Sequence, residues 1–276
     1  MKVATPDPNL PIGVFDSGLG GLTIVKAIQA LLPQEEICYY GDTAHLPYGD
    51  KSAVLVQEFS RNIARFLVKH PVKAVVIACN TASATALEEV QKVAGTLPVF
   101  DVINPAVKVA IESSRTDQIG VIGTRTTIRS GVYTKKLLSH SPTARIIEKA
   151  TPLLVPMIEE GWLQNAVSQD VIDAYLSDTG FQQIDCLILG CTHYPLIKPQ
   201  VQRYFEENYD HQVEVVDSSL AVARSLSSGL LQRKIIRQDP KKTPHHIYFL
   251  SDYNVHFEET ARVFLGKSLH FEVSPL

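Results

Sequence analysis

Near residue 79 the chain reads Val76-Ile77-Ala78-Cys79-Asn80-Thr81, a short apolar run that ends in a cysteine and a polar turn. A similar string, Ile188-Leu189-Gly190-Cys191-Thr192, occurs in the second half of the chain. Apolar, β-branched runs of this length are typical of buried strands. An amphipathic stretch follows each turn, so each string predicts a strand that leads through a cysteine turn into a helix.

A second internal match supports a duplication. The run Ile12-Gly13-Val14-Phe15-Asp16-Ser17 resembles Ile119-Gly120-Val121-Ile122-Gly123-Thr124. The two matches occur in the same order and at nearly the same offset along the chain. We therefore expect two similar halves, each with one cysteine turn.

The alternation of strands and helices extends along the chain. Strands are predicted at Ile12–Asp16, Ile37–Gly41, Ala74–Ala78, Val99–Ile103, Gln118–Ile122, Asp185–Leu189, Val213–Val216 and, late in the chain, His246–Asp252. Helices are predicted at Leu22–Leu32, Ser52–His70, Ala82–Ala94, Ala106–Ser113, Ile128–Ser139, Val155–Leu176, Pro199–Glu207, Leu220–Ile235 and in a short segment that ends at Leu265. This alternation indicates an α/β fold with parallel sheets that are covered by helices on both faces.

Composition and charge exclude several classes of protein. The 276 residues are 45% hydrophobic and 20% charged, which is ordinary for a globular chain and not for a disordered one. A net charge of -3 provides no basic surface for nucleic acid or for an anionic membrane. No apolar run has the length of a membrane helix, and the polar segment 1–11 does not resemble a signal peptide. We therefore expect a cytoplasmic protein.

The four cysteines are too few for a disulfide scaffold, and no pair has CxxC spacing. A metal site is therefore not expected. Cys38 and Cys186 lie inside predicted strands, which indicates inert core residues.

Cys79 and Cys191 stand at predicted carboxyl ends of strands, where open α/β sheets bind ligands. Either Asn80 or Thr81 can cap the helix that follows Cys79. A thiol beside a helix N-terminus is expected to have a lowered pKa. His193 is two residues from Cys191 and could orient that thiol or accept its proton.

A facing pair of thiols allows two kinds of chemistry. One is a redox disulfide, which usually has CxxC spacing. The other is acid–base work, in which one thiolate removes a proton from a carbon and the second thiol returns one to the opposite face. That arrangement inverts a stereocentre without a cofactor. A two-domain protein that only binds an amino acid is a further alternative, and it has no need of paired thiols.

A glycine-rich turn, Asp16-Ser17-Gly18-Leu19-Gly20-Gly21, follows the first predicted strand, and its N–H groups could bind an anion. The turn matches neither GxGxxG nor a P-loop, which disfavours a nucleotide-binding enzyme. Asp16 could bind an amino group or receive a proton near Cys79.

Four motifs occur together: Phe15-Asp16-Ser17-Gly18-Leu19-Gly20-Gly21, Pro47-Tyr48-Gly49, Cys79-Asn80-Thr81-Ala82-Ser83 and Gly190-Cys191-Thr192-His193-Tyr194-Pro195. Over about residues 12–230 the chain closely resembles the glutamate racemases of the aspartate/glutamate racemase superfamily. The resemblance implies a cofactor-independent enzyme that interconverts L- and D-glutamate. It also implies a bacterial source and a role in supplying D-glutamate for peptidoglycan.

The resemblance implies roles for individual residues. Cys79 would take the proton from D-glutamate and Cys191 would take it from L-glutamate, with Asp16 and His193 as their polar helpers. The residues that it implies for binding the substrate are Asp16, Ser17, Tyr48, Gly49, Asn80, Thr81, Thr192 and His193.

A further acid is expected at Glu159, with the adjacent Glu160 as the alternative. Aspartate racemases are the nearest related class of enzyme. They typically have His in place of Ser83 and an acidic residue in place of His193, so both positions favour glutamate.

The resemblance also implies the architecture: two pseudo-symmetric, doubly wound, parallel-sheet α/β domains with the active site in the cleft between them. The first domain would comprise residues 1–97 plus 212–276, and the second residues 98–211. Glutamate is the expected small-molecule partner, no metal or cofactor is expected, and a homodimer is left open. We assign no chemistry to the tail 233–276.

Overall fold

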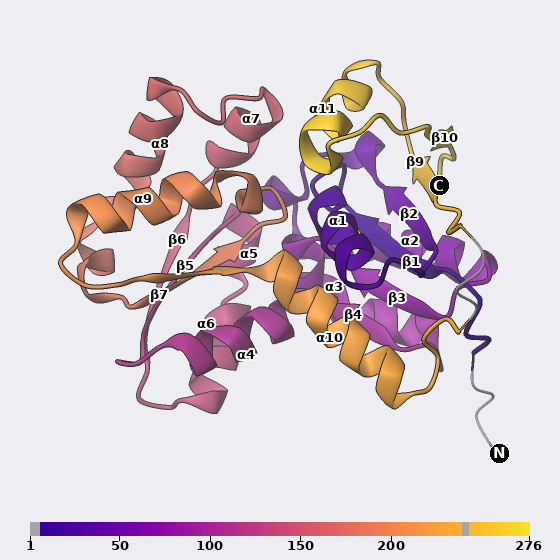
Figure 1. The fold of residues 1–276 in the computed structure, drawn as a ribbon, viewed down its shortest axis with the longest axis horizontal. Coiled ribbons are helices and arrows are strands. Elements are labelled where there is room, and N and C mark those ends of the chain that lie inside the picture. Colours follow the sequence, from indigo (N-terminus) through magenta and orange to yellow (C-terminus); the bar gives the residue numbers. More distant parts are fainter. Residues whose placement is uncertain (1–5, 239–242) are drawn as a thin grey trace.

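The computed structural model describes residues 6–238 and 243–276 and contains two parallel sheets (Figure 1). The larger sheet has the strand order β10-β9-β2-β1-β3-β4, and the smaller has the order β6-β5-β7-β8. The larger sheet comprises β1 (Ile12–Asp16), β2 (Ile37–Gly41), β3 (Ala74–Ile77), β4 (Val99–Asp101), β9 (Ile247–Leu250) and β10 (Glu272–Val273). The smaller comprises β5 (Gln118–Gly123), β6 (Arg145–Ala150), β7 (Cys186–Gly190) and β8 (Glu214–Asp217).

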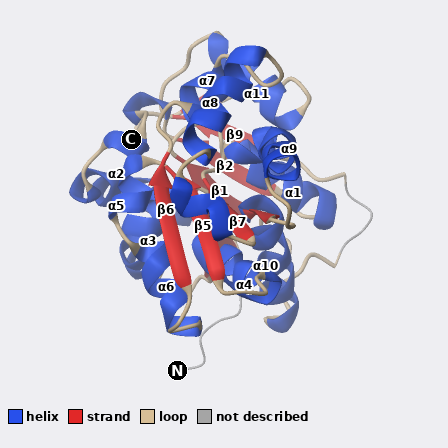
Figure 2. Cartoon of the chain, turned by 90° about the vertical axis from the view of Figure 1, so that its left-hand side faces the viewer, coloured by secondary structure: helices blue, strands red, loops and turns tan. Residues whose placement is uncertain are grey.

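Helices lie on both sides of the strands (Figure 2). The α-helices are α1 (Leu22–Leu31), α2 (Ala53–Lys69), α3 (Asn80–Ala94), α4 (Ile103–Ser113), α5 (Arg125–Arg129), α6 (Val132–His140), α7 (Leu154–Glu159), α8 (Ala166–Leu176), α9 (Lys198–Asn208), α10 (Ser218–Gln232) and α11 (His256–Leu265). Short 3-10 turns are η1 (Thr43–His45), η2 (Tyr48–Asp50), η3 (Thr179–Gln183) and η4 (Tyr194–Ile197).

Strand β1 shows why the central strands of the sheets consist largely of apolar residues. Val14 belongs to one core cluster with Leu22 of α1. The next residue, Phe15, belongs to a second cluster with Ile63 of α2. Successive side chains of a strand point to opposite faces, so a sheet covered on both faces needs apolar residues at every position.

The two sheets repeat one topology. The order β2-β1-β3-β4 in the larger sheet matches β6-β5-β7-β8 in the smaller one, strand for strand. Cys79 follows β3 and Cys191 follows β7, so the two cysteine turns occupy equivalent places. The predicted α/β fold and its two similar halves are therefore confirmed.

Sheet membership differs from the expected division of the chain. Strand β4 pairs with β3 of the larger sheet, although residue 98 was the expected start of the second domain. Strand β8 pairs with β7 of the smaller sheet, although residue 212 was the expected return to the first. The chain therefore passes between the sheets after Asp101 and again after Asp217.

Two of the predicted long helices are interrupted. Gly131 separates α5 from α6 and Gly161 lies between α7 and α8, each with a positive φ that suits glycine and breaks a helix. The prediction also missed β6, because this edge strand is charged and only partly buried. The tail 233–276, to which we assign no chemistry, includes residues 239–242, and the polar segment 1–11 includes residues 1–5; both parts lie outside the described residues.

Within residues 6–238 and 243–276, no helix combines the length and the apolar character that crossing a membrane requires.

Candidate active site

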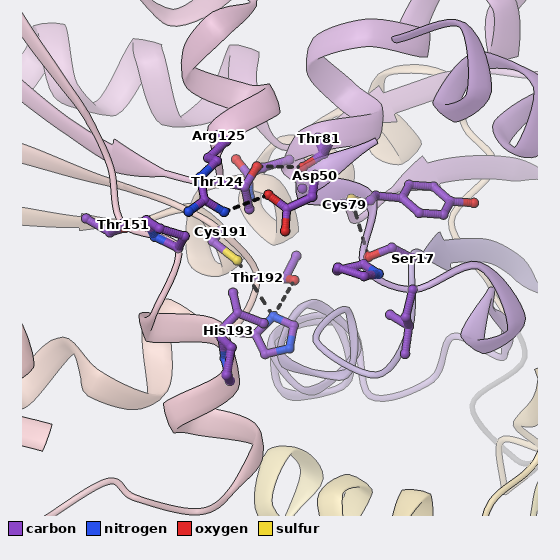
Figure 3. A pocket seen from close by; sticks show the side chains of 18 of the residues that line it. Ser17, Asp50, Cys79, Thr81, Thr124, Arg125, Thr151, Cys191, Thr192 and His193 are labelled. Carbon is purple, nitrogen blue, oxygen red and sulfur yellow. Dashed lines mark hydrogen bonds and ion pairs between the residues drawn. The ribbon is translucent and has the colours of Figure 1, made fainter. Parts of the chain in front are cut away.

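A cavity of about 210 Å³ lies at the carboxyl ends of both sheets. Ser17 and Cys79 follow β1 and β3 of the larger sheet, whereas Thr124 and Cys191 follow β5 and β7 of the smaller sheet. Its lining comprises Ser17, Leu46, Pro47, Tyr48, Gly49, Asp50, Cys79, Asn80, Thr81, Thr124, Arg125, Thr151, Pro152, Val155, Pro156, Glu159, Cys191, Thr192 and His193. Figure 3 shows Cys79 and Cys191 on opposite sides of this cavity.

Cys79 is itself the N-cap of α3, in place of the expected Asn80 or Thr81. Its Sγ accepts a hydrogen bond from the Ala82 N–H at 3.4 Å and lies 3.7 Å from Ser17 Oγ. Burial and the nearby Asp16 carboxylate raise the pKa of Cys79 to about 12, against the lowering effect of these two hydrogen bonds. The expected lowered pKa of Cys79 is therefore wrong, because the effect of desolvation is larger than that of the helix N-terminus.

Asp16 lies behind Cys79 and does not line the cavity. Its Oδ2 accepts hydrogen bonds from Gly18 N–H at 3.2 Å and Gly21 N–H at 2.9 Å. Its Oδ1 is buried and has no hydrogen-bond partner among the described residues. Burial raises the pKa of Asp16, and the charge of His193 opposes that rise.

His193 connects Cys191 to Glu159. Its Nδ1 lies 3.6 Å from Cys191 Sγ, and its Nε2 lies 3.0 Å from Glu159 Oε1. Although burial lowers the pKa of His193, its hydrogen bonds to Cys191 and Glu159 raise that pKa to about 10. Glu160, the alternative acid, does not line this cavity.

Asn80 and Thr81 link the two halves. The buried Tyr133 hydroxyl donates to Asn80 Oδ1 at 2.7 Å. The Nδ2 of the same amide has no hydrogen-bond partner among the described residues. Thr81 Oγ1 lies 2.9 Å from Thr124 Oγ1 and 3.2 Å from Thr127 Oγ1. These polar groups provide donors and acceptors for a small polar ligand.

Tyr48 and Gly49 form part of a turn whose place is set by Asp42. The Tyr48 hydroxyl donates to Asp42 Oδ2 at 2.5 Å, and His45 Nδ1 lies 2.8 Å from Asp42 Oδ1. A Cβ on Gly49 would lie 2.8 Å from the Thr124 Cβ, so glycine permits a close approach of the two halves here.

The structure thus brings all but one of the sequence-predicted site residues to the cavity wall, Asp16 being the one that stands behind it. The prediction missed several lining residues, among them Asp50, Thr124, Arg125 and Thr151. Thr124 could have been found, because it matches Ser17 in the internal repeat. Thr151 could not, because it follows β6, a strand that the pattern did not predict.

The cavity combines two thiols, a protonatable imidazole, two carboxylates and several hydroxyls. This set can bind a small amino acid and transfer protons at two faces of one atom. Among the residues that the structure describes, no group of three His, Cys, Asp or Glu side chains is placed to hold a metal ion.

Comparison with known proteins agrees with this site. The sequence profile described as Asp/Glu/Hydantoin racemase matches residues 22–226. A glutamate racemase of Neisseria meningitidis is 41% identical over 259 residues, 94% of each chain. Another, of Geobacter metallireducens, is 43% identical over 258 residues, 94% of this chain and 93% of the other. The crystal structure of Francisella tularensis glutamate racemase in complex with D-glutamate has a TM-score of 0.89 and 38% identity, covering 97% of this chain and 98% of that one. The chain therefore belongs to the Asp/Glu/hydantoin racemase family.

Proposed function

We propose that this chain interconverts L- and D-glutamate, with Cys79 and Cys191 as the acid and base and without a cofactor. The observation that carries the proposal is the position of the two thiols, which enter one cavity from opposite sides (Figure 3). The similarity to glutamate racemases, one of them in complex with D-glutamate, supports the choice of substrate.

In the reaction from L-glutamate, the Cys191 thiolate removes the Cα proton, and the electron pair of the C–H bond stays on the substrate as a carbanion. The Cys79 thiol then donates its proton to the opposite face of Cα, which gives D-glutamate and a Cys79 thiolate. From D-glutamate the two residues exchange roles. One proton then passes from Cys191 to Cys79 through polar neighbours or solvent before the next turnover in the same direction.

The surroundings of the thiols fit these roles. His193, whose pKa is raised to about 10, carries a proton near neutral pH, and its Nδ1 lies 3.6 Å from Cys191 Sγ. Cys79, whose pKa is raised to about 12, holds its proton and is ready to donate it. Asp16 adds to that rise, which makes it a helper of Cys79.

We propose that the substrate is bound by the polar groups around the two thiols. The hydroxyls of Ser17, Thr81 and Thr192 and the Asn80 amide suit carboxylates and an ammonium group. Tyr48 and Gly49 shape the wall on the side of the larger sheet. We propose that the chain forms two domains, one built on each sheet, and that these domains enclose the ligand between them.

The cellular role that we propose is the supply of D-glutamate for peptidoglycan in the cytoplasm of a bacterium. Expression of the chain in a bacterial host that lacks its own glutamate racemase tests this role. Growth without added D-glutamate supports it, and continued dependence on D-glutamate by a host that makes the active enzyme contradicts it.

The reaction is tested with chelator-treated protein and L-glutamate in D2O, without added pyridoxal phosphate. We expect inversion with deuterium uptake at Cα, and loss of inversion in Cys79→Ala and in Cys191→Ala. Cys38→Ala and Cys186→Ala are matched controls, because these two buried cysteines lie outside the cavity and should keep the activity. Inversion of aspartate but not of glutamate would overturn the substrate assignment, and inversion by either Cys79→Ala or Cys191→Ala would overturn the mechanism.

A further inference from the structure

The side chain of Thr23 joins the two halves beside the active site. Thr23 is the second residue of α1 and is buried, with 6% of its surface exposed. Its Oγ1 lies 2.7 Å from the carbonyl oxygen of Thr192, which follows β7 of the other sheet. The same Oγ1 lies 2.9 Å from the carbonyl oxygen of Gly20, in its own half.

One hydroxyl has one proton to donate, so these two carbonyls compete for it. The Gly20 oxygen already accepts the Thr23 backbone N–H at 3.0 Å. The Thr192 oxygen has no other donor among the described residues, and Thr192 is itself buried. Since an unpaired buried carbonyl is costly, the proton goes to Thr192. The Gly20 oxygen stays within reach, so breaking the bond between the halves does not leave the hydroxyl without a partner.

The bond holds together two turns that touch each other. A Cβ built on Gly20 would lie 2.4 Å from His193 Cε1 and 2.5 Å from Thr192 Oγ1. Only glycine permits so close an approach, and the Thr23 bond lies beside that contact. The hydrogen bond from Thr23 Oγ1 to the Thr192 carbonyl therefore helps to fix the distance between the two turns.

Each of these turns carries part of the chemistry. The Gly21 N–H in the first turn donates to Asp16 Oδ2 at 2.9 Å. In the second turn Thr192 is the residue between Cys191 and His193 in the chain, and Figure 3 shows the side chains of all three. A change at the Thr192 carbonyl therefore moves the backbone that places the Cys191 thiol and the imidazole.

We propose that Thr23 is a positioning residue that holds the Cys191–His193 turn against the Asp16 turn by donating its hydroxyl proton to the Thr192 carbonyl. Its effect on catalysis rests on the function proposed above, whereas its effect on the geometry of the turn does not. Thr23 has no part in binding the substrate or in moving its protons.

The test compares Thr23→Val, which keeps the shape and removes the hydroxyl, with Thr23→Ser, which keeps the hydroxyl. We expect Thr23→Val to lower kcat for glutamate about tenfold, the effect of one net hydrogen bond, with a smaller change in KM. Thr23→Ser should restore most of that loss. Equal losses in the two variants, or no loss in Thr23→Val, would overturn the proposal.

A second measurement is independent of the reaction. Alkylation of the thiols by iodoacetamide is followed residue by residue by mass spectrometry, with Cys79 as the internal reference. We expect Thr23→Val, and not Thr23→Ser, to change the alkylation rate of Cys191 relative to that of Cys79. An unchanged ratio would overturn the proposal, even with an altered kcat. If the wild type fails to invert glutamate, the proposed function is wrong, and this ratio still decides the role of Thr23. Should Thr23→Val not fold, Thr23→Ala replaces it in both measurements.

Discussion

The Nε2 atom of His193 lies 3.0 Å from the Oε1 atom of Glu159, although the two residues come from different segments of the smaller half. The imidazole is buried, whereas 38% of the Glu159 side chain is exposed. The carboxylate therefore lies between the imidazole and solvent, and its charge helps to keep the ring protonated.

Glu159→Gln should lower the pKa of His193 and reduce stability in a pH-dependent way. Hydrogen bonds to Cys191 and to Glu159 together raise this pKa from 6.5 to about 10, so the stability that they contribute is complete below pH 6.5 and is lost as the pH rises through 10. Thermal unfolding should therefore show the largest difference between wild type and variant at the acid end of this range. Glu160→Gln is the matched control and should unfold as the wild type does. Parallel unfolding curves for Glu159→Gln and wild type across the range would contradict the assignment.

Gly20→Ala should abolish most of the activity. The added Cβ would lie 2.4 Å from His193 Cε1, so the imidazole must leave its place beside Cys191. Because His193 assists Cys191 in the proposed mechanism, we expect this displacement to lower kcat about a hundredfold or more. Gly18→Ala is the control, because the three atoms nearest to its Cβ all belong to the Leu46 side chain, whose end can move. Equal activity of Gly20→Ala and Gly18→Ala would contradict the close contact between Gly20 and His193.

Arg125 and Asp50 should affect substrate binding in opposite directions. Arg125 and Asp50 both line the cavity, where Arg125 Nη1 lies 2.9 Å from Asp50 Oδ1, and both side chains are about half exposed. An exposed pair of this kind contributes only about 0–1 kcal/mol to stability. Arg125→Gln should raise KM for the anionic substrate and weaken the salt dependence of kcat/KM, whereas Asp50→Asn frees the guanidinium and should lower KM. Steady-state kinetics at several ionic strengths checks this, and changes of the same sign would contradict it.

Tyr133→Phe should destabilise the protein through Asn80. Both side chains are buried, and the phenol donates to Asn80 Oδ1 at 2.7 Å. Leaving that acceptor unpaired should cost about 1–3 kcal/mol in the free energy of unfolding, measured with denaturant. Tyr253→Phe removes a hydroxyl from a tyrosine that is 40% exposed, and it should cost far less. A smaller loss for Tyr133→Phe than for Tyr253→Phe would argue against the Asn80 contact.

Most of the fold could be predicted because its central strands are buried on both faces and consist largely of apolar residues, as in β1 and β7. Strand β6 could not, since an edge strand tolerates the charges of Arg145, Glu148 and Lys149. The sequence did not predict that β4 belongs to the larger sheet and β8 to the smaller, because the pairing partner of a strand is not encoded in its local sequence pattern.

The candidate site follows the same distinction. Cys79 and Cys191 were predicted because strand ends and an internal repeat are local signals. The raised pKa of Cys79 was not predicted, because it depends on burial and on Asp16, which only the folded chain brings together. Thr23 was not singled out either, since nothing local marks a threonine on an apolar helix as a link to Thr192.

Mirror-image amino acids have the same free energy in water, so the equilibrium between L- and D-glutamate cannot depend on the protein. The ratio of kcat/KM in the two directions must therefore equal unity, even though Cys79 has Asp16 behind it and Cys191 has His193 and Glu159. The ratio of the two kcat values must therefore equal the ratio of the two KM values. In the proposed mechanism, the different neighbours of the two thiols can thus determine which enantiomer saturates the enzyme at the lower concentration and how fast each is turned over, but not the position of the equilibrium.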